Sequence, residues 1–235
     1  MSMGSEQWQS LETGSASEPI RVLGEPRSST AKENPLWFRC AEKLIALVAL
    51  LVGLPLMAIE GVIIKLGSPG PVLFVHDRMS VNMRVFRFAK FRTHYADAKE
   101  RFPQHYAYRY SAEDLPGLRY KTVDDPRVTP QGRWLRRTSI DEWPNFWHVL
   151  TGDMTLVGPR PEIPEMLPYY TEEMRKKFTV RPGITGLAQV SGRSRLTFYE
   201  TVNYDLEYVK NKSILLDLKI IARTFKVILT DSGGF

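Results

Sequence analysis

The sequence predicts an α+β fold that is mostly helical and is attached to a membrane near its N-terminus. An apolar run at Leu44–Ile64 has the length of about 20 residues that a bilayer crossing requires. Two short β-type segments follow it, and helical apolar periodicity marks much of the C-terminal half. With 235 residues, the chain is long enough for one substantial domain with appendages.

The composition narrows the classes of partner. The formal net charge of +6 indicates negatively charged partners, and nucleic acid, anionic lipid and phosphorylated substrates all fit it. No RNP, zinc-finger or helix-turn-helix pattern is visible, so we expect no nucleic-acid partner. Cys40 is the single cysteine, which excludes an intramolecular disulfide and a cysteine-based zinc cluster. The histidines are too far apart to suggest a metal site.

We divide the chain into three regions. Residues 1–35 are polar without apolar periodicity and are predicted to be a disordered tail. Residues 36–66 form the membrane helix, and residues 67–235 form the remaining domain. Within the helix Pro55 predicts a kink or break, and Glu60 is costly if it faces lipid. A segment that bends at Pro55 and returns to the same side fits these features about as well as one kinked spanning helix.

The rest of the chain predicts a hairpin and three helices. Strands are expected at Val72–His76 and Val85–Phe88, joined by a loop without glycine. An apolar helix face is formed by Trp143, Phe146, Trp147 and Leu150, with Gly152 placed to end that helix. Further helices are expected at Tyr199–Lys210 and Ile214–Leu229. The last has an apolar stripe opposite basic residues, which suits either the lipid headgroup layer or packing on the protein's own core. Its stripe consists of Leu215, Leu218, Ile221, Phe225 and Ile228.

Asp141 and Glu142 are the first candidate site. Pro144 fits the first turn of a helix, so both carboxylates are expected at that helix's N-terminus, where the helix dipole favours ionised acids. A purely structural role in capping the helix also fits these residues, because Asp is a preferred N-cap and Ser139 with Glu142 matches a capping box. An ionised acidic pair is also what a Mg²⁺ site or a carboxylate nucleophile requires.

Basic and glycine-containing segments supply the other candidates. Arg160 lies between two prolines that fix its backbone, which suits a phosphate ligand, although a pair with Glu162 would also explain it. Glycine turns within residues 181–193 are expected to present backbone N–H groups to phosphate, with Arg193 beside them. The last candidates are Lys90 and Arg92 after the second strand, and Asp205 in the helix 199–210.

The order and wording of five segments carry a family resemblance. They read KFRT, DPRVTPQGRWLRRTSIDEWP, LTGDMTLVGPRPE, RPGITGLAQVSGR and YDLEYVKNKSILLDLKII. Over about residues 37–231 the chain resembles the bacterial sugar transferase family, and in particular its short, exopolysaccharide-type members. These are monotopic phosphoglycosyl transferases, which begin glycan assembly on undecaprenyl phosphate at the cytoplasmic face of the bacterial inner membrane. The resemblance implies a cytosolic catalytic domain with interfacial amphipathic helices.

The resemblance also implies roles for individual residues. Asp141 matches a nucleophile that attacks the β-phosphate of a UDP-sugar, releases UMP and forms a covalent aspartyl-phosphosugar. Glu142 matches its partner at a Mg²⁺ site, so the metal ligands are expected to be Asp141 and Glu142. Lys90 matches a catalytic basic residue, and Pro55 matches the proline that bends a re-entrant helix. The substrate-binding positions that the motifs match are Arg92, Arg160, Arg193 and Asp205.

The chain departs from the family pattern at three places. Leu54 stands where a serine often precedes the proline, the hairpin loop lacks its usual glycine, and His94 stands where methionine usually follows the FRT triplet. These departures bear on the hairpin geometry and on substrate preference. The competing hypothesis is that the chain is a non-enzymatic protein that binds anionic membranes. This hypothesis explains the charge and the amphipathic segments but not an acidic pair among basic loops.

Overall fold

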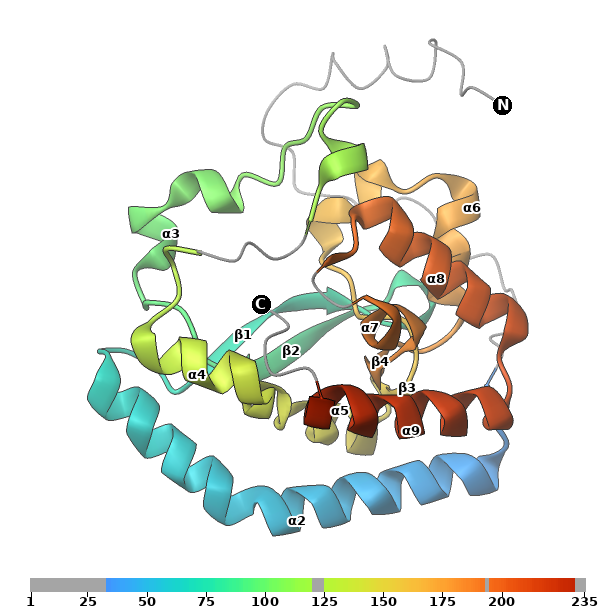
Figure 1. The fold of residues 1–235 in the computed structure, drawn as a ribbon, viewed down its shortest axis with the longest axis horizontal. Coiled ribbons are helices and arrows are strands. Elements are labelled where there is room, and N and C mark those ends of the chain that lie inside the picture. The colour runs from blue at the N-terminus through green and yellow to red at the C-terminus, as the bar shows by residue number, and fades with distance from the viewer. Residues whose placement is uncertain (1–32, 120–124, 193–194, 231–235) are drawn as a thin grey trace.

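The computed structural model describes residues 33–119, 125–192 and 195–230 (Figure 1). Most of the predicted tail 1–35, and Arg193, therefore lie outside the described residues. The α-helices are α2 (Leu36–Gly67), α3 (Ala98–Arg101), α4 (Pro130–Thr138), α5 (Asn145–Thr151), α6 (Glu172–Arg175), α7 (Leu187–Ser191), α8 (Phe198–Asn211) and α9 (Ile214–Thr230). The strands are β1 (Leu73–Met79), β2 (Val85–Phe91), β3 (Thr155–Val157) and β4 (Gly183–Thr185). Short 3-10 helices cover Val81–Met83, Pro103–Tyr106, Leu115–Gly117, Ile140–Glu142, Pro164–Tyr169 and Lys176–Thr179.

Helix α2 is continuous through Pro55, so the predicted break at this proline is corrected to a bend. Figure 1 shows α2 along the lower edge of the molecule, bent near its middle, with α4 and α5 lying above it. Proline removes one backbone donor and crowds the preceding turn, and such a local defect bends a helix whose two arms are long enough to continue.

Helix α2 has one protein-facing stripe and a broad apolar surface. Within the described chain it is the one helix that is long and apolar enough to cross a membrane, judged by length and composition alone. Its buried residues recur every four or seven positions and therefore lie on one face. They are Phe38, Glu42, Ala46, Gly53, Glu60 and Ile64. Large apolar side chains such as Val52, Leu54 and Leu66 are exposed on the other faces.

The domain holds α2 along its whole length. Near its start, the Glu42 carboxylate accepts hydrogen bonds from the Thr155 hydroxyl and from the backbone N–H of Leu156. Ala46 belongs to an apolar cluster with residues of the hairpin and of α5. Near its end, Ile64 packs with Phe91 and Leu135.

The predicted hairpin is confirmed and is longer than expected. Strands β1 and β2 pair antiparallel from Leu73 opposite Phe91 to Met79 opposite Val85. Asn82 and Met83 form the turn with φ values of 55° and 59°. A two-residue hairpin turn of this kind requires positive φ at both central positions, and asparagine tolerates it better than most residues. The loop therefore makes a tight turn without glycine.

Two glycine-containing motifs pack backbone against backbone. Strands β3 and β4 pair in parallel, with Thr155 opposite Gly183. The N–H of Gly158 donates to the Thr185 carbonyl, and the N–H of Gly183 donates to the Pro159 carbonyl. Gly183 lies in the segment that is predicted to present N–H groups to phosphate, and its amide is used in this pairing instead. The pairing places the Arg160 loop beside β4.

The predicted C-terminal helices are confirmed as α8 and α9. Helix α8 begins at a capping box between Thr197 and Glu200. In α9, Asp217 and Ile220 are buried, whereas most of the predicted apolar stripe is exposed, including Leu215 and Phe225. Figure 1 shows α9 above the N-terminal arm of α2 in this view and roughly parallel to it.

Helix α5 connects the interior of the domain to α2. Gly152 ends it with a φ of 87°, as predicted. Its buried residues include His148 and Val149. Of the predicted apolar face, Phe146 and Leu150 pack against the cluster that contains Ala46 of α2, whereas Trp147 is exposed. At the start of this segment, a Cβ on Gly53 of α2 would overlap the ring of Trp143. The glycine therefore permits the close approach of α2 to residues 140–143.

Candidate active site

Asp141 and Glu142 lie in the single 3-10 turn Ile140–Glu142, between α4 and α5. Helix α5 starts only at Asn145, so the pair precedes the helix. Ser139 adopts a left-handed conformation, with φ 57° and ψ 17°, and its side chain makes no capping hydrogen bond. The capping-box interpretation of Ser139 and Glu142 is therefore wrong. Asp141 is 5% exposed, which is unusual for a carboxylate unless charge partners surround it.

Three cations from three separate segments surround Asp141. Lys90 on β2, Arg136 on α4 and Arg160 in the loop after β3 all lie close enough to feel its charge. Burial, helped by the charges of the nearby arginines, lowers the pKa of the half-buried Lys90 to about 7, against the opposing effect of Asp141. Lys90 can therefore exchange a proton near neutral pH.

Arg160 connects the two acidic residues. Its two terminal nitrogens lie 3.1 and 3.2 Å from the same oxygen of Glu142. The charge of Glu142, together with these hydrogen bonds, raises the pKa of Arg160. Glu142 thus orients the guanidinium beside Asp141, and the proposed pairing of Arg160 with Glu162 is replaced by one with Glu142.

Arg136 is held in place by polar contacts with the segment that follows β2. It donates to Nε2 of His94 at 2.7 Å and to the Thr93 hydroxyl at 3.2 Å. Because arginine can only donate, His94 accepts at Nε2. Burial and the nearby Arg136 lower the pKa of His94 far below its usual range, so the ring is neutral. The histidine at position 94, where the family usually has methionine, therefore helps to orient the Arg136 side chain.

Asp125 and Arg127 close this network with a bidentate pair. Two nitrogens of Arg127 lie 2.8 Å from the two oxygens of Asp125, and the Arg127 N–H donates to the same carboxylate at 3.0 Å. Burial alone would raise the pKa of Asp125, but the hydrogen bonds and the charge of Arg127 lower it well below its usual range. A carboxyl whose pKa is depressed on folding stabilises the fold above its unfolded pKa, and loses that contribution as the pH falls further.

We expect Asp125→Asn to destabilise the protein by about 2 kcal/mol at pH 7, since it removes hydrogen bonds to a charged partner. The difference from wild type should shrink as the pH falls below about 3.9, where the unfolded carboxyl becomes protonated. Thermal unfolding in detergent at pH 7 and at acidic pH measures both values. A difference that stays constant down to the lowest pH at which the protein is folded would contradict the pairing.

Two predicted site residues are engaged elsewhere. Arg92 donates to the carbonyls of Ser68, Pro69 and Pro71, at 2.6 to 2.9 Å, and so holds the chain where it leaves α2. Asp205 is buried in an ion pair with Lys177 at 2.8 Å. The structure thus brings together Lys90, Asp141, Glu142 and Arg160. Substrate binding by Arg92, Asp205 and Arg193 stays a prediction.

The sequence reasoning did not assign Glu60 to the site. Its side chain is completely buried on the face of α2 that approaches residues 140–143, and the charge of Asp141 acts on it. The available signal was a lone acidic residue in an apolar run, because such a residue almost always faces the protein interior.

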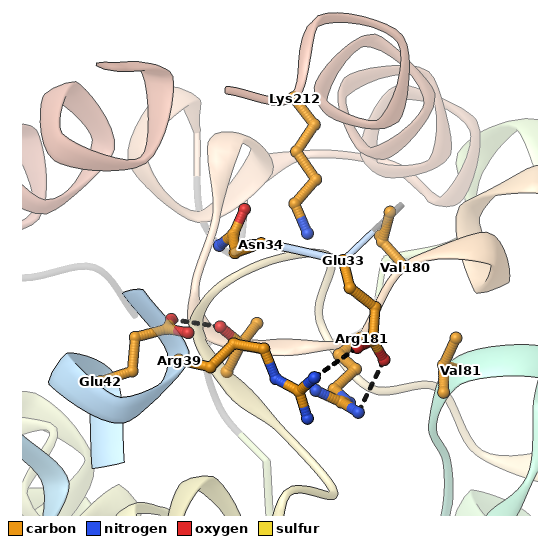
Figure 2. Close-up of a pocket in the computed structure, with 9 residues that line it drawn as sticks. Glu33, Asn34, Arg39, Glu42, Val81, Val180, Arg181 and Lys212 are labelled. Atoms are coloured by element: carbon orange, nitrogen blue, oxygen red, sulfur yellow. Dashed lines mark hydrogen bonds and ion pairs between the residues drawn. The ribbon is translucent and has the colours of Figure 1, made fainter. Parts of the chain in front are cut away.

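A separate pocket lies where α2 begins (Figure 2). There the carboxylate of Glu33 lies between Arg39 and Arg181, at 2.6 and 2.7 Å from their guanidinium nitrogens. Lys212 and Glu42 line the same pocket. These contacts fasten the start of α2 to the loop before β4.

Comparison with known proteins gives the family. A family model described as bacterial sugar transferase matches residues 34–231. An undecaprenyl-phosphate glucose phosphotransferase of Komagataeibacter xylinus is 42% identical over 234 residues, covering 92% of this chain and 41% of that protein. The galactosyl transferase CpsE of Streptococcus agalactiae is 42% identical over 166 residues, covering 70% of this chain and 36% of that protein. The chain thus spans less than half of each of these two relatives.

A third relative is similar to this chain over nearly its whole length. The exopolysaccharide production protein ExoY of Rhizobium meliloti is 32% identical over 223 residues, which covers 95% of this chain and 98% of that protein. Both this match and the family model include the segments that carry Lys90, Asp141, Glu142 and Arg160. The protein belongs to the bacterial sugar transferase family.

Proposed function

We propose that this protein transfers a sugar-1-phosphate from a UDP-sugar to undecaprenyl phosphate, with release of UMP, in the synthesis of an exopolysaccharide or another surface glycan. The observation that carries the proposal is the buried Asp141, surrounded by Lys90, Arg136 and Arg160 and lying against an apolar helix with an exposed outer surface. The names of two relatives, an undecaprenyl-phosphate glucose phosphotransferase and a galactosyl transferase, agree with it.

The first displacement uses Asp141 as the nucleophile. Its carboxylate oxygen attacks the β-phosphorus of the UDP-sugar and forms a P–O bond, while the bond from that phosphorus to the bridging oxygen breaks and UMP leaves. Arg160 and Lys90 face the charge of the diphosphate, and Glu142 keeps the guanidinium of Arg160 in place. Electrostatic stabilisation of this kind supplies most of the catalysis in phosphoryl transfer.

The second displacement regenerates the carboxylate. A phosphate oxygen of the carrier lipid attacks the phosphorus of the aspartyl-phosphosugar, and the Asp141 oxygen leaves as carboxylate. The product is a polyprenyl diphosphate sugar. Two steps at one carboxylate replace one difficult transfer between two anionic substrates.

The residues present fit a Mg²⁺ ion, with Asp141 and Glu142 as the expected ligands. In the described part of the chain, no three acidic, histidine or cysteine side chains form a preformed metal site. Mg²⁺ usually binds to one or two carboxylates and completes its shell with water and substrate phosphates, so a sparse set is suitable. When bound, the ion would neutralise charge on the diphosphate.

Purified protein with Mg²⁺, undecaprenyl phosphate and a panel of UDP-sugars tests the proposal. We expect UMP release that depends on the lipid under multiple turnover, with a hexose donor preferred. Without the lipid, one labelled sugar phosphate should remain bound to each enzyme. If the protein binds anionic vesicles and releases no UMP from any donor, the non-enzymatic membrane-binding function replaces this one.

We also propose that α2 enters the cytoplasmic leaflet of the inner membrane and returns to the same face. At about 1.5 Å per residue its length exceeds the bilayer core. The polar domain is bound at Glu42 near one end and at Ile64 near the other, so an upright helix would carry charged groups into lipid. Exposed apolar side chains on α2 and α9 would then share one membrane surface.

Cysteine labelling distinguishes this arrangement from a spanning helix. In a Cys40→Ser background, Leu36→Cys and Leu66→Cys place single thiols at the two ends of α2, both at exposed positions. A membrane-impermeant maleimide should label both thiols in inside-out vesicles and neither in intact spheroplasts. Asp97→Cys, in the domain, reports which side the reagent reaches. Labelling of the two ends from opposite sides would contradict the re-entrant model.

A further inference from the structure

Glu60 is a buried carboxylate without a partner. Its side chain is 0% exposed, and among the described residues neither of its oxygens has a hydrogen-bond partner. Burying a carboxylate without hydrogen bonds is strongly unfavourable. An unsatisfied buried group in a native fold therefore requires a specific reason, such as an ion or water that completes it.

The surroundings of Glu60 point to Asp141. Gly53 lies against Trp143, which fixes α2 against the segment that carries the acidic pair. Glu60 follows Gly53 by two helical turns and so lies on the same face of α2. Asp141 is the charged group that acts on Glu60, and the two carboxylates repel each other.

The side chain of Glu142 points in a different direction from that of Asp141. In a 3-10 turn there are three residues per turn, so consecutive side chains point about 120° apart. Asp141 is almost completely buried, whereas Glu142 is half-buried and holds Arg160. Glu142 therefore has a partner in place, while the described part of the chain offers Glu60 no hydrogen-bond partner.

We propose that Glu60 is a ligand of the divalent cation at Asp141, contributed to the site by the membrane helix. A cation between the two carboxylates would satisfy the oxygens of Glu60 and replace a repulsion by two attractions. Carboxylate oxygens are preferred ligands of Mg²⁺, and the remaining positions are left to water and substrate phosphate. This inference rests on the proposed function, because it uses the cation at Asp141, and it assigns that ion a ligand outside the acidic pair.

Mn²⁺ binding to the full chain in lipid nanodiscs tests the assignment, measured by electron paramagnetic resonance without any substrate. We expect Glu60→Gln to weaken Mn²⁺ binding by about tenfold or more, since even the loss of a side chain that only supports a metal ligand commonly costs about 10- to 100-fold in affinity. Without metal, the variant should unfold at the same temperature as wild type or at a higher one, because a repulsion is removed. Addition of Mg²⁺ should raise the unfolding temperature of the wild type more than that of the variant.

Glu42→Gln is the matched control. Glu42 is also a buried carboxylate of α2, but it accepts hydrogen bonds from Thr155 and Leu156 at the other end of the helix. This variant should bind Mn²⁺ like wild type. If Glu60→Gln does not fold, Glu60→Ala removes the same carboxylate with a residue suited to a helix.

The outcomes separate this inference from the proposed function. Wild-type Mn²⁺ affinity in the Glu60 variants, together with weakened binding in Asp141→Asn, overturns the role of Glu60 and leaves the site at Asp141 intact. Wild-type affinity in Asp141→Asn as well overturns the cation site itself. Equal losses in Glu60→Gln and Glu42→Gln would mean that any buried charge in α2 affects the site, and would also overturn the assignment.

Discussion

Asp141→Asn is expected to reduce UMP release by at least about 1,000-fold, because loss of a covalent nucleophile removes the reaction path rather than a binding contact. The amide keeps the size of the side chain and still fits its buried position. It cannot form a stable bond to phosphorus. Incubation with a labelled UDP-sugar and no lipid should leave label on the wild type and none on the variant.

The control for Asp141→Asn is Asp97→Asn, which removes an exposed acid on the same domain. This control should retain wild-type activity. The variant at position 141 should keep its membrane attachment, and its unfolding temperature should stay within a few degrees of wild type. Arg136 and Arg160 keep their hydrogen bonds to other side chains in this variant. UMP release by Asp141→Asn at a rate near wild type would show that the carboxylate does not attack the donor.

Gly183→Ala is expected to lower stability by about 3 kcal/mol, the upper part of the range for overpacking. A Cβ at this position would lie 2.5 Å from the Thr185 carbonyl oxygen and closer still to the Gly158 amide nitrogen. Both neighbours are backbone atoms of the β3–β4 pair, so no side chain can move aside. For a chain of this size the unfolding temperature should fall by roughly 10 °C.

Gly117→Ala is the control for Gly183→Ala. A Cβ on Gly117 would meet no atom within 4 Å, and its φ is not in the left-handed region. Its unfolding temperature should therefore equal that of wild type. A Gly183→Ala protein as stable as wild type would mean that the two glycine motifs are not packed as described. Because Arg160 follows Gly158, the destabilised variant should also lose activity through this loop.

Local patterns predicted the elements that depend on local chemistry. The hairpin, α8, α9 and the end of α5 at Gly152 were predicted, because alternation, capping residues and a helix-ending glycine act over a few positions. For α2 the sequence predicted a kink or a break at Pro55 without deciding between them, since the outcome depends on contacts at both ends of the helix. The short parallel pair β3–β4 was also missed, because parallel strands are joined through distant segments and leave little local signal.

The sequence predicted which residues form the core of the site, but it did not predict which of them contact one another. Lys90, Asp141, Glu142 and Arg160 lie together, as the motifs implied. Arg92 adjoins the same motif, but strand β2 ends at Phe91, and Arg92 turns toward the loop that follows α2. The partner of Asp205 is Lys177, which is far away in sequence, and no periodicity connects the two.

In most membrane-anchored enzymes the anchor is a tether, and a soluble fragment can be made by cutting it off. Here the anchor is also an interior element: Ala46 and Ile64 of α2 complete two of the apolar clusters that hold the hairpin and α4. Removal of residues 33–67 would uncover those clusters to water. Evolution of this chain toward a free cytosolic form would therefore require a rebuilt core, and not only a lost targeting segment.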